Sequence, residues 1–266
     1  EFAGAGGDGV ARGLDGEHWV KAFARYSDNG WRGTVNVASR NKDVPTAYYG
    51  TDFGVPGNYV RDRQAHGDLV YSAALADDWT QFARVHLGVY AYDAEYVYAG
   101  AKSRDEAYAQ WWETEYRLGY AGWANHQVQL GADFRRNARM EQRYFDLMPR
   151  IDHLDDRRSE NTLGLYAQDE WRFAAAWTLQ LDLRLDHTPA AGNIGSPRWA
   201  MIYRPQPGTS AKMIYGRAFR APNAYERYYT DGSTQKVGPG LDAERIETTE
   251  LTVDHVNPRS QGGIST

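Results

Sequence analysis

The stretch AAAWTLQLDLRLDHTP, residues 174–189, contains a run in which apolar and polar side chains alternate strictly. From Trp177 to Leu185 each odd position holds Trp or Leu, and each even position from Thr178 to Asp186 holds a polar or charged residue. A period of two places successive side chains on opposite faces of an extended strand. The stretch therefore predicts a β-strand with one apolar face and one charged face.

The same period recurs along most of the chain. It is clear in residues 79–92, 112–120 and 126–135, and weaker in 18–26, 31–40, 64–76, 161–173, 197–204, 209–220 and 243–256. No segment shows a convincing helical period. The sequence thus predicts an all-β protein of about eleven strands.

Composition excludes several classes of protein. The chain of 266 residues holds 19 Tyr, 9 Trp and no Cys, and its mean hydropathy is -0.70. No apolar run is long enough for a transmembrane helix, and a net charge of -5 gives no basic footprint for nucleic acid. Without cysteine there are no disulfides, thiolate metal sites or cysteine nucleophiles. The start EFAGAGGDG has neither an initiator Met nor a signal region, so we expect a mature piece or an internal fragment.

The connections between the predicted strands alternate in length. Short ones fall at 27–30, 76–78, 122–125, 174–176 and 205–208, and long ones at 41–63, 93–108, 138–160, 189–196 and 221–242. In consecutive antiparallel strands this places all tight turns at one end and all long loops at the other. That layout is typical of an up-and-down barrel in an outer membrane.

Tryptophans lie at or near the short connections. They are Trp31, Trp79, Trp123, Trp171 and Trp177. Folded as antiparallel strands, they gather at one level, as in the aromatic girdle of a membrane interface. In this interpretation the leucines of the opening stretch face lipid, and Asp182, Arg184 and Asp186 face a wet lumen.

Other classes share part of this pattern. A soluble β-sandwich also alternates apolar and polar positions, with Trp filling the end of its core. A passive porin would form a closed, even-stranded barrel of its own. A barrel enzyme would need a carboxylate–His or Ser–His pair at matched heights on neighbouring strands.

Three stretches resemble the TonB-dependent receptors, plugged barrels that import scarce nutrients across the outer membrane of Gram-negative bacteria. They are LGLYAQDEWRFAAAWTLQLDLRLDH (163–187), SPRWAMIYRPQPGTSAKMIYGRAFRAPNAYERYY (196–229) and LDAERIETTELTVDHV (241–256). Such barrels have about 22 strands, whereas the chain shows about eleven and no recognisable plug domain or TonB box. The resemblance therefore implies that residues 1–266 form a partial transmembrane β-barrel domain, without the plug and the remaining strands.

The resemblance also implies a function in transport rather than catalysis. The ligand would be an iron–siderophore, haem, cobalamin or similar metal chelate, and the partners would be outer-membrane lipid and TonB, which acts through the absent plug. No catalytic residue, cofactor, metal site or nucleic-acid partner is expected. The candidate ligand contacts are loop and upper-lumen residues: Tyr48, Tyr49, Tyr59, Tyr96, Tyr98, Arg220, Tyr225, Tyr228 and Tyr229.

Three further motifs have simpler interpretations. IDHLDDRR (151–158) offers oxygen ligands for Ca²⁺ but lacks the EF-hand spacing, so we expect a solvated charged loop. GAGGDG (4–9) fits a dinucleotide-binding pattern but neither follows a strand nor opens a helix. The predicted lumen carboxylates and their basic neighbours favour charge ladders between adjacent strands; they are Glu170, Asp182, Asp186 and Glu250 with Arg172, Arg184, Arg198 and Arg245.

Overall fold

The computed structural model describes residues 8–256 and 263–265, which form one antiparallel sheet with its strands in chain order. The strands are β1 (Glu17–Asp28), β2 (Trp31–Asp43), β3 (Tyr59–Ala76), β4 (Trp79–Tyr98), β5 (Ala101–Tyr120), β6 (His126–Leu147), β7 (Arg150–Ala174), β8 (Trp177–Thr188), β9 (Gly192–Gln206), β10 (Thr209–Arg220), β11 (Glu244–Val256) and β12 (Gly263–Ser265). A 3₁₀ turn, η1 (Tyr48–Gly50), and a short helix, α1 (Ala224–Tyr228), lie in the loops. The all-β, up-and-down prediction is confirmed. A single sheet also contradicts the β-sandwich alternative.

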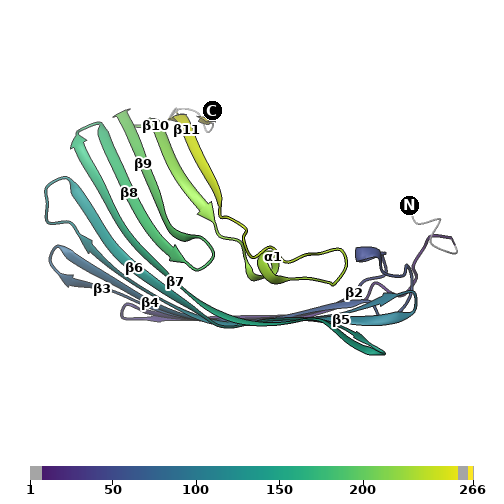
Figure 1. Cartoon of the computed structure of the whole chain (residues 1–266). Helices are drawn as coiled ribbons and strands as arrows, with labels where there is room; N and C mark the ends of the chain where they lie inside the picture. The colour runs from purple at the N-terminus through teal and green to yellow at the C-terminus, as the bar shows by residue number, and fades with distance from the viewer. Residues whose placement is uncertain (1–7, 257–262, 266) are drawn as a thin grey trace.

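The sheet curls into an open trough rather than a closed ring (Figure 1). Strands β8 to β11 rise along one side of the trough, and the far ends of β4 to β7 extend away from it. The loop that carries α1 lies on the concave side, above these extended strand ends. Residues 4–7 of the GAGGDG motif lie outside the described residues.

The five short connections are confirmed as the turns of one sheet end. The turn between β1 and β2 consists of Asn29 and Gly30, which have φ angles of 46° and 83°. Positive φ at both central residues is the requirement of the two-residue hairpin turn that matches strand twist, and Asn-Gly meets it best. The register places Asp28 opposite Trp31. Local sequence therefore sets this hairpin.

The opposite end differs from the prediction. Segments 93–108 and 138–160 are not loops: β4 and β5 meet at Ala99–Gly100, and β6 and β7 meet at Met148–Pro149. The connection after β8 is also short, covering residues 189–191. Among the connections that the structure describes, only 44–58 and 221–243 are long. Segments 93–108 and 138–160 show no apolar–polar alternation in the sequence, because beyond the apolar band both faces of the sheet carry polar side chains. The alternation therefore did not identify them as strands.

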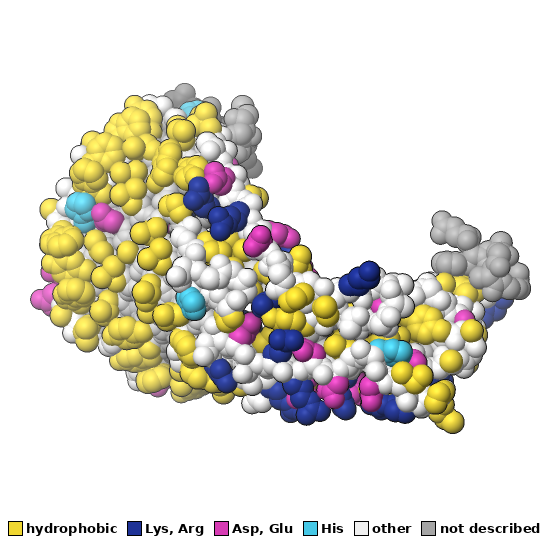
Figure 2. All heavy atoms as spheres, in the orientation of Figure 1, with side chains coloured by type: hydrophobic (Ala, Val, Ile, Leu, Met, Phe, Trp, Pro, Cys, Tyr) yellow, Lys and Arg dark blue, Asp and Glu magenta, His cyan; other side chains and the backbone are white. Residues whose placement is uncertain are grey.

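One face of the curled region is apolar. Figure 2 shows hydrophobic side chains gathered over this region, whereas charged side chains gather along the lower edge of the straight extension. The outward leucines Leu181, Leu183 and Leu185 of β8 are 47%, 48% and 53% exposed in the chain alone. A lipid-facing band has this composition. Among the described residues, no helix has the length and apolar character required to span a membrane.

Aromatic side chains border the apolar band at the end with the five short turns. Trp31 packs on Tyr71 and Trp79 on Tyr120, with ring centroids 4.6 Å apart in both pairs. Trp177 stacks on Tyr203 at 4.4 Å. These pairs join neighbouring strands at one level, as the predicted girdle requires.

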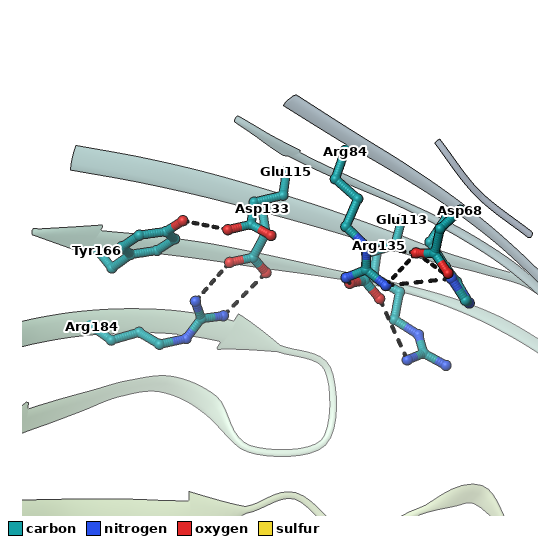
Figure 3. Close-up of polar contacts among 9 residues, drawn as sticks. Asp68, Arg84, Glu113, Glu115, Asp133, Arg135, Tyr166 and Arg184 are labelled. Carbon is teal, nitrogen blue, oxygen red and sulfur yellow. Dashed lines mark hydrogen bonds and ion pairs between the residues drawn. The ribbon is translucent and has the colours of Figure 1, made fainter. Parts of the chain in front are cut away.

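The concave face carries the charges (Figure 3). Arg184 of β8 binds Asp133 of β6 through two hydrogen bonds of 2.7 and 3.1 Å and also pairs with Asp186. Tyr166 donates to Glu115 at 2.6 Å, and Arg84 pairs with Asp68 at 2.7 Å. Charged side chains that would be costly in hydrocarbon are thus paired on the opposite face, as the sequence predicted.

Candidate functional site: a tyrosine-lined pocket

A pocket of about 530 Å³ lies between the extended ends of β4, β5 and β6 and the loop that carries α1. This volume is in the range of small-molecule sites. Its lining is rich in tyrosine: Tyr49, Tyr90, Tyr92, Tyr96, Tyr98, Asp105, Ala107, Gln142, Tyr144, Tyr225, Tyr229, Asp231, Thr234 and Gln235.

Strand β4 forms the floor of the pocket. Tyr90, Tyr92, Tyr96 and Tyr98 occupy even positions and therefore share one face of the strand. The hydroxyl oxygens of Tyr92 and Tyr96 are 2.8 Å apart and share a hydrogen bond. Because β4 continues as a strand beyond the apolar band, this row of rings extends to the tip of the sheet.

The loop between β10 and β11 covers the pocket. Asn223 begins α1 with a capping box: its side chain accepts from Glu226 N, and the Glu226 carboxylate accepts from Asn223 N. The helix then presents Tyr225 and Tyr229, whose rings are 4.5 Å apart, toward the strands. Tyr229 donates to Asp105 Oδ2 at 3.1 Å, and Gln142 donates to the carbonyl of Ala224 at 3.1 Å. These two bonds attach the loop to the sheet.

The loop between β2 and β3 closes a second side. Asp52 accepts hydrogen bonds of 2.9 Å from the backbone N–H groups of both Ala99 and Gly100, at the tip of the β4–β5 hairpin. Asn58 accepts from Val97 N at 2.8 Å. The anchored loop holds Tyr49 edge-on to Tyr96, with ring centroids 6.2 Å apart.

The pocket has a negative electrostatic character. Burial raises the pKa of the Asp105 carboxyl to about 6, although the Tyr229 hydroxyl acts in the other direction. Burial also acts to raise the pKa of Asp231, but hydrogen bonds from the Thr234 side chain and from the backbone of residues 233–235 hold it well below its usual range. At neutral pH both groups therefore carry charge, that of Asp231 over the wider pH range.

The tyrosines remain neutral phenols at neutral pH. The hydrogen bond with Tyr48 raises the pKa of Tyr49 to about 12, and burial raises that of Tyr98 to about 12. They offer ring faces and hydroxyl groups rather than phenolate oxygens. The pocket can therefore stack flat ligand surfaces and hydrogen-bond to polar ligand groups.

The predicted contact residues divide into two groups. The structure brings Tyr49, Tyr96, Tyr98, Tyr225 and Tyr229 together in the pocket lining, and Tyr48 packs against Tyr49 with ring centroids 4.0 Å apart. The other three lie elsewhere. Tyr59 lies under Arg61 on the outer face, Tyr228 lies against Arg158, and Arg220 pairs with Glu226 and Glu244 at the base of the loop.

Sequence reasoning missed part of the lining. Tyr90 and Tyr92 continue the even-numbered row of β4, a signal that was present in the alternation. Asp105, Gln142 and Tyr144 were missed because, in segments expected to be loops, no strand alternation assigned their side chains to a face. Their positions follow from the register of β5 with β6, which needs the structure.

The motif IDHLDDRR lies in β7 rather than in a loop. Asp152 pairs with Arg150 at 2.7 Å, and Asp156 pairs with Arg158 at 2.8 Å. Within the described part of the chain, no group of three or more His, Cys, Asp or Glu residues has the arrangement of a metal site. Cross-strand and same-strand pairing accounts for the charges of the motif.

Histidine–carboxylate pairs on neighbouring strands do occur. They are His86 with Asp68, His126 with Asp169, and His153 with Asp146. At the last pair Ser103 donates to Asp146 at 2.6 Å, so the order is Ser–Asp–His. A nucleophilic triad needs His between Ser and Asp, and this arrangement instead gives two donors to one carboxylate. These hydrogen bonds connect β5, β6 and β7.

The fold and the pocket define a class of protein: one part of an up-and-down barrel with a ligand-sized pocket at the loop-bearing end. Residues 8–265 match the family model described as TonB dependent receptor-like, beta-barrel. The chain therefore belongs to the TonB-dependent receptor β-barrel family, which is a family of receptors and transporters. No curated protein matches.

Several solved structures share the fold. A mutant of the ferric enterobactin receptor PfeA from Pseudomonas aeruginosa has a TM-score of 0.67 and 14% identity, over 94% of this chain and 42% of that one. The ferric citrate transporter FecA has a TM-score of 0.72 and 11% identity, over 92% and 42%. The siderophore receptor PirA from Acinetobacter baumannii has a TM-score of 0.65 and 10% identity, over 91% and 41%. The chain spans less than half the length of these structures.

Proposed function

We propose that this chain is the ligand-capturing part of an outer-membrane receptor that imports a scarce nutrient, bound as a metal chelate or a cobalamin-like molecule. The observation that carries the proposal is the tyrosine-lined pocket at the loop-bearing end of a receptor-family barrel. Two anchored loops cover it, and its volume of about 530 Å³ suits a small molecule. The names of the similar structures, a ferric enterobactin receptor, a ferric citrate transporter and a siderophore receptor, support the same class of cargo.

The membrane and the energy source belong to the same proposal. The apolar band over the curled region faces the lipid of a Gram-negative outer membrane, and TonB drives release through a plug outside this chain. Along the whole of β1 the residues are exposed, and β1 pairs only with β2 among the described strands. Unpaired backbone groups in hydrocarbon cost several kcal/mol each, so further strands of the protein close the barrel.

Uptake by cells tests the proposed function. A strain that depends on the full-length receptor would be supplied with radiolabelled ferric chelates and cobalamin, with and without functional TonB. At least one cargo should accumulate only when both the receptor and TonB are present. Accumulation of none, or accumulation that is independent of TonB, would contradict the proposal.

Two variants locate the cargo. The substitution Tyr96→Ala removes a ring that is buried in the pocket. An aromatic contact is worth about 0.5–1.5 kcal/mol beyond the area it buries, so uptake at low cargo concentration should fall roughly tenfold. Tyr59→Ala is the matched control, because Tyr59 lies on the outer face of β3 under Arg61. Uptake through the control should equal that of the unchanged receptor. Equal uptake through both variants would place the cargo elsewhere.

A further inference from the structure

The pocket contains acidic groups without basic ones. Asp105 and Asp231 are its only charged side chains among the described lining residues. Lysine and arginine occur nearby on the same strands. The strand register, rather than composition, therefore determines which charges reach the pocket.

Alternation along β5 sends the basic side chains to the other face. Asp105 points toward the pocket, and its neighbours Arg104 and Glu106 point outward. On that outer face Arg104 and Lys102 both pair with Glu95. Each of these cations is thus separated from the pocket by the sheet.

Two further cations near the pocket, Arg143 and Arg158, are also engaged outside the lining. Arg143 pairs with Glu106 at 3.5 Å on the outer face. The guanidinium of Arg158 lies 3.4 Å from the centre of the Tyr228 ring, outside the pocket lining. Among the described residues no Lys or Arg belongs to the pocket lining, so the lining itself offers no basic side chain to neutralise an anion.

The aromatic walls of the pocket favour positively charged ligands, as its carboxylates do. The face of a tyrosine ring carries the negative part of its quadrupole and attracts cations. Tyr96 and Tyr98 present rings from the strand side, and Tyr225 and Tyr229 from the loop side. Ring faces and carboxylates together favour positive charge and disfavour negative charge.

We propose that this pocket selects a ligand that is positively charged or neutral, with flat or apolar faces that stack on tyrosine, and that it rejects anionic ligands. The inference rests on the pocket being the capture site of the proposed receptor. It narrows the cargo to cationic or uncharged chelates and related ring-bearing molecules. Chelates that present carboxylate or other anionic groups at their surface are outside this class.

Binding of three small aromatic probes of different charge tests the proposal. The probes are benzyltrimethylammonium, benzyl alcohol and benzenesulfonate, titrated into the purified full-length receptor in detergent and followed by ligand-observed NMR. Binding to the pocket is the part of the signal that the variant Tyr96→Ala removes. The cation should bind at least roughly tenfold more tightly than the anion, since two carboxylates lie within the same pocket.

Charge variants provide the matched control. Asp105→Asn removes a carboxylate from the pocket and keeps its shape, so the preference for the cation should fall several-fold. Glu106→Gln removes the charge of the next carboxylate along β5, on the outer face. It should leave the preference for the cationic probe unchanged. An equal effect of the two variants would show that the preference is not set in the pocket.

Two other outcomes would overturn the proposal. One is tighter binding of benzenesulfonate, and the other is no pocket binding of the cation at millimolar concentration. The result is separate from the uptake assay. If the receptor prefers the cationic probe but transports no cargo, the proposed charge selectivity is supported and the proposed transport function is contradicted.

Discussion

Strands β4 to β7 run through both the curled and the extended region of this sheet, whereas β8 to β11 lie in the curled region. In the curled region β8 carries leucine outward and paired charges inward. Beyond the apolar band the outward face is itself charged, with Arg63 of β3 paired with Asp93 of β4 at 2.9 Å. Between β4 and β5 the backbone pairing continues through both regions without a register shift. Apolar–polar alternation therefore depends on what surrounds a strand, whereas the strand itself is defined by its backbone hydrogen bonds.

The comparison predicts that replacing an exposed apolar side chain with arginine is costly in the curled region and tolerated in the extension. Leu183 and Ile151 are 48% and 47% exposed in the chain alone. Leu183→Arg places a charge in the apolar band and should cost about 2–4 kcal/mol of folding free energy in lipid. Ile151→Arg lies at the tip of the extension and should change that free energy by no more than about 0.5 kcal/mol.

Urea titration of the full-length receptor in lipid vesicles measures both values. Gln168→Arg is a further control, because Gln168 lies on the concave face opposite Asp182 in the register. It should behave like Ile151→Arg. Similar costs for Leu183→Arg and Ile151→Arg would mean that the apolar band does not face lipid.

A second prediction concerns packing on the concave face of the curled region. The ring of Tyr166 covers Gly131, so that a Cβ atom there would clash with Tyr166 Cζ, and Tyr166 also donates to Glu115 at 2.6 Å. Gly131→Val should displace the ring and cost about 1–3 kcal/mol. Gly33→Val is the control, because nothing lies within 4 Å of a Cβ at Gly33. The same urea titration compares them, and equal stabilities would contradict the packing argument.

The curled region was predictable from the sequence because water and lipid act on opposite faces of each strand. The leucines of β8, the Asn-Gly turn at Asn29 and the tryptophans near the turns each have a local physical cause. The lengths of β4 to β7 were not predictable from hydropathy, because no apolar face marks their extensions. The strands there are recognised only through their partners.

The pocket was also predictable from the sequence in part. Aromatic residues in long connections identified Tyr49, Tyr225 and Tyr229 as candidates. The sequence could not separate Tyr225 from Tyr228, three positions away on a short helix, because the direction of α1 is set by its contacts with β6. Asp105 depended on knowing which face of β5 points inward.

The smallest predicted effect lies in the extension and depends on pH. The ordinary pKa of an aspartate is 3.8, and burial beneath the loop raises that of Asp105 to about 6. The closed loop therefore favours the protonated form, so its stability decreases as the pH rises from about 4 to 6, and the full cost is present above that range. Without ligand, the loop 221–243 should be better protected at pH 5 than at pH 7.5, as amide-exchange protection factors corrected for intrinsic rates would show.

The groups around Asp105 determine how this measurement is controlled. It accepts a hydrogen bond from Tyr229, and Glu106 is its neighbour. Its negative charge acts to raise the pKa of Tyr49, Tyr92, Tyr96, Tyr98 and Tyr144. His153, which lies against Gly232 of the same loop, is the nearby imidazole. Asp105→Asn should keep the loop protected at both pH values, and His153→Asn should keep the pH dependence. The reverse result would assign the pH response to the imidazole, and the curled region should show no change in any of these variants.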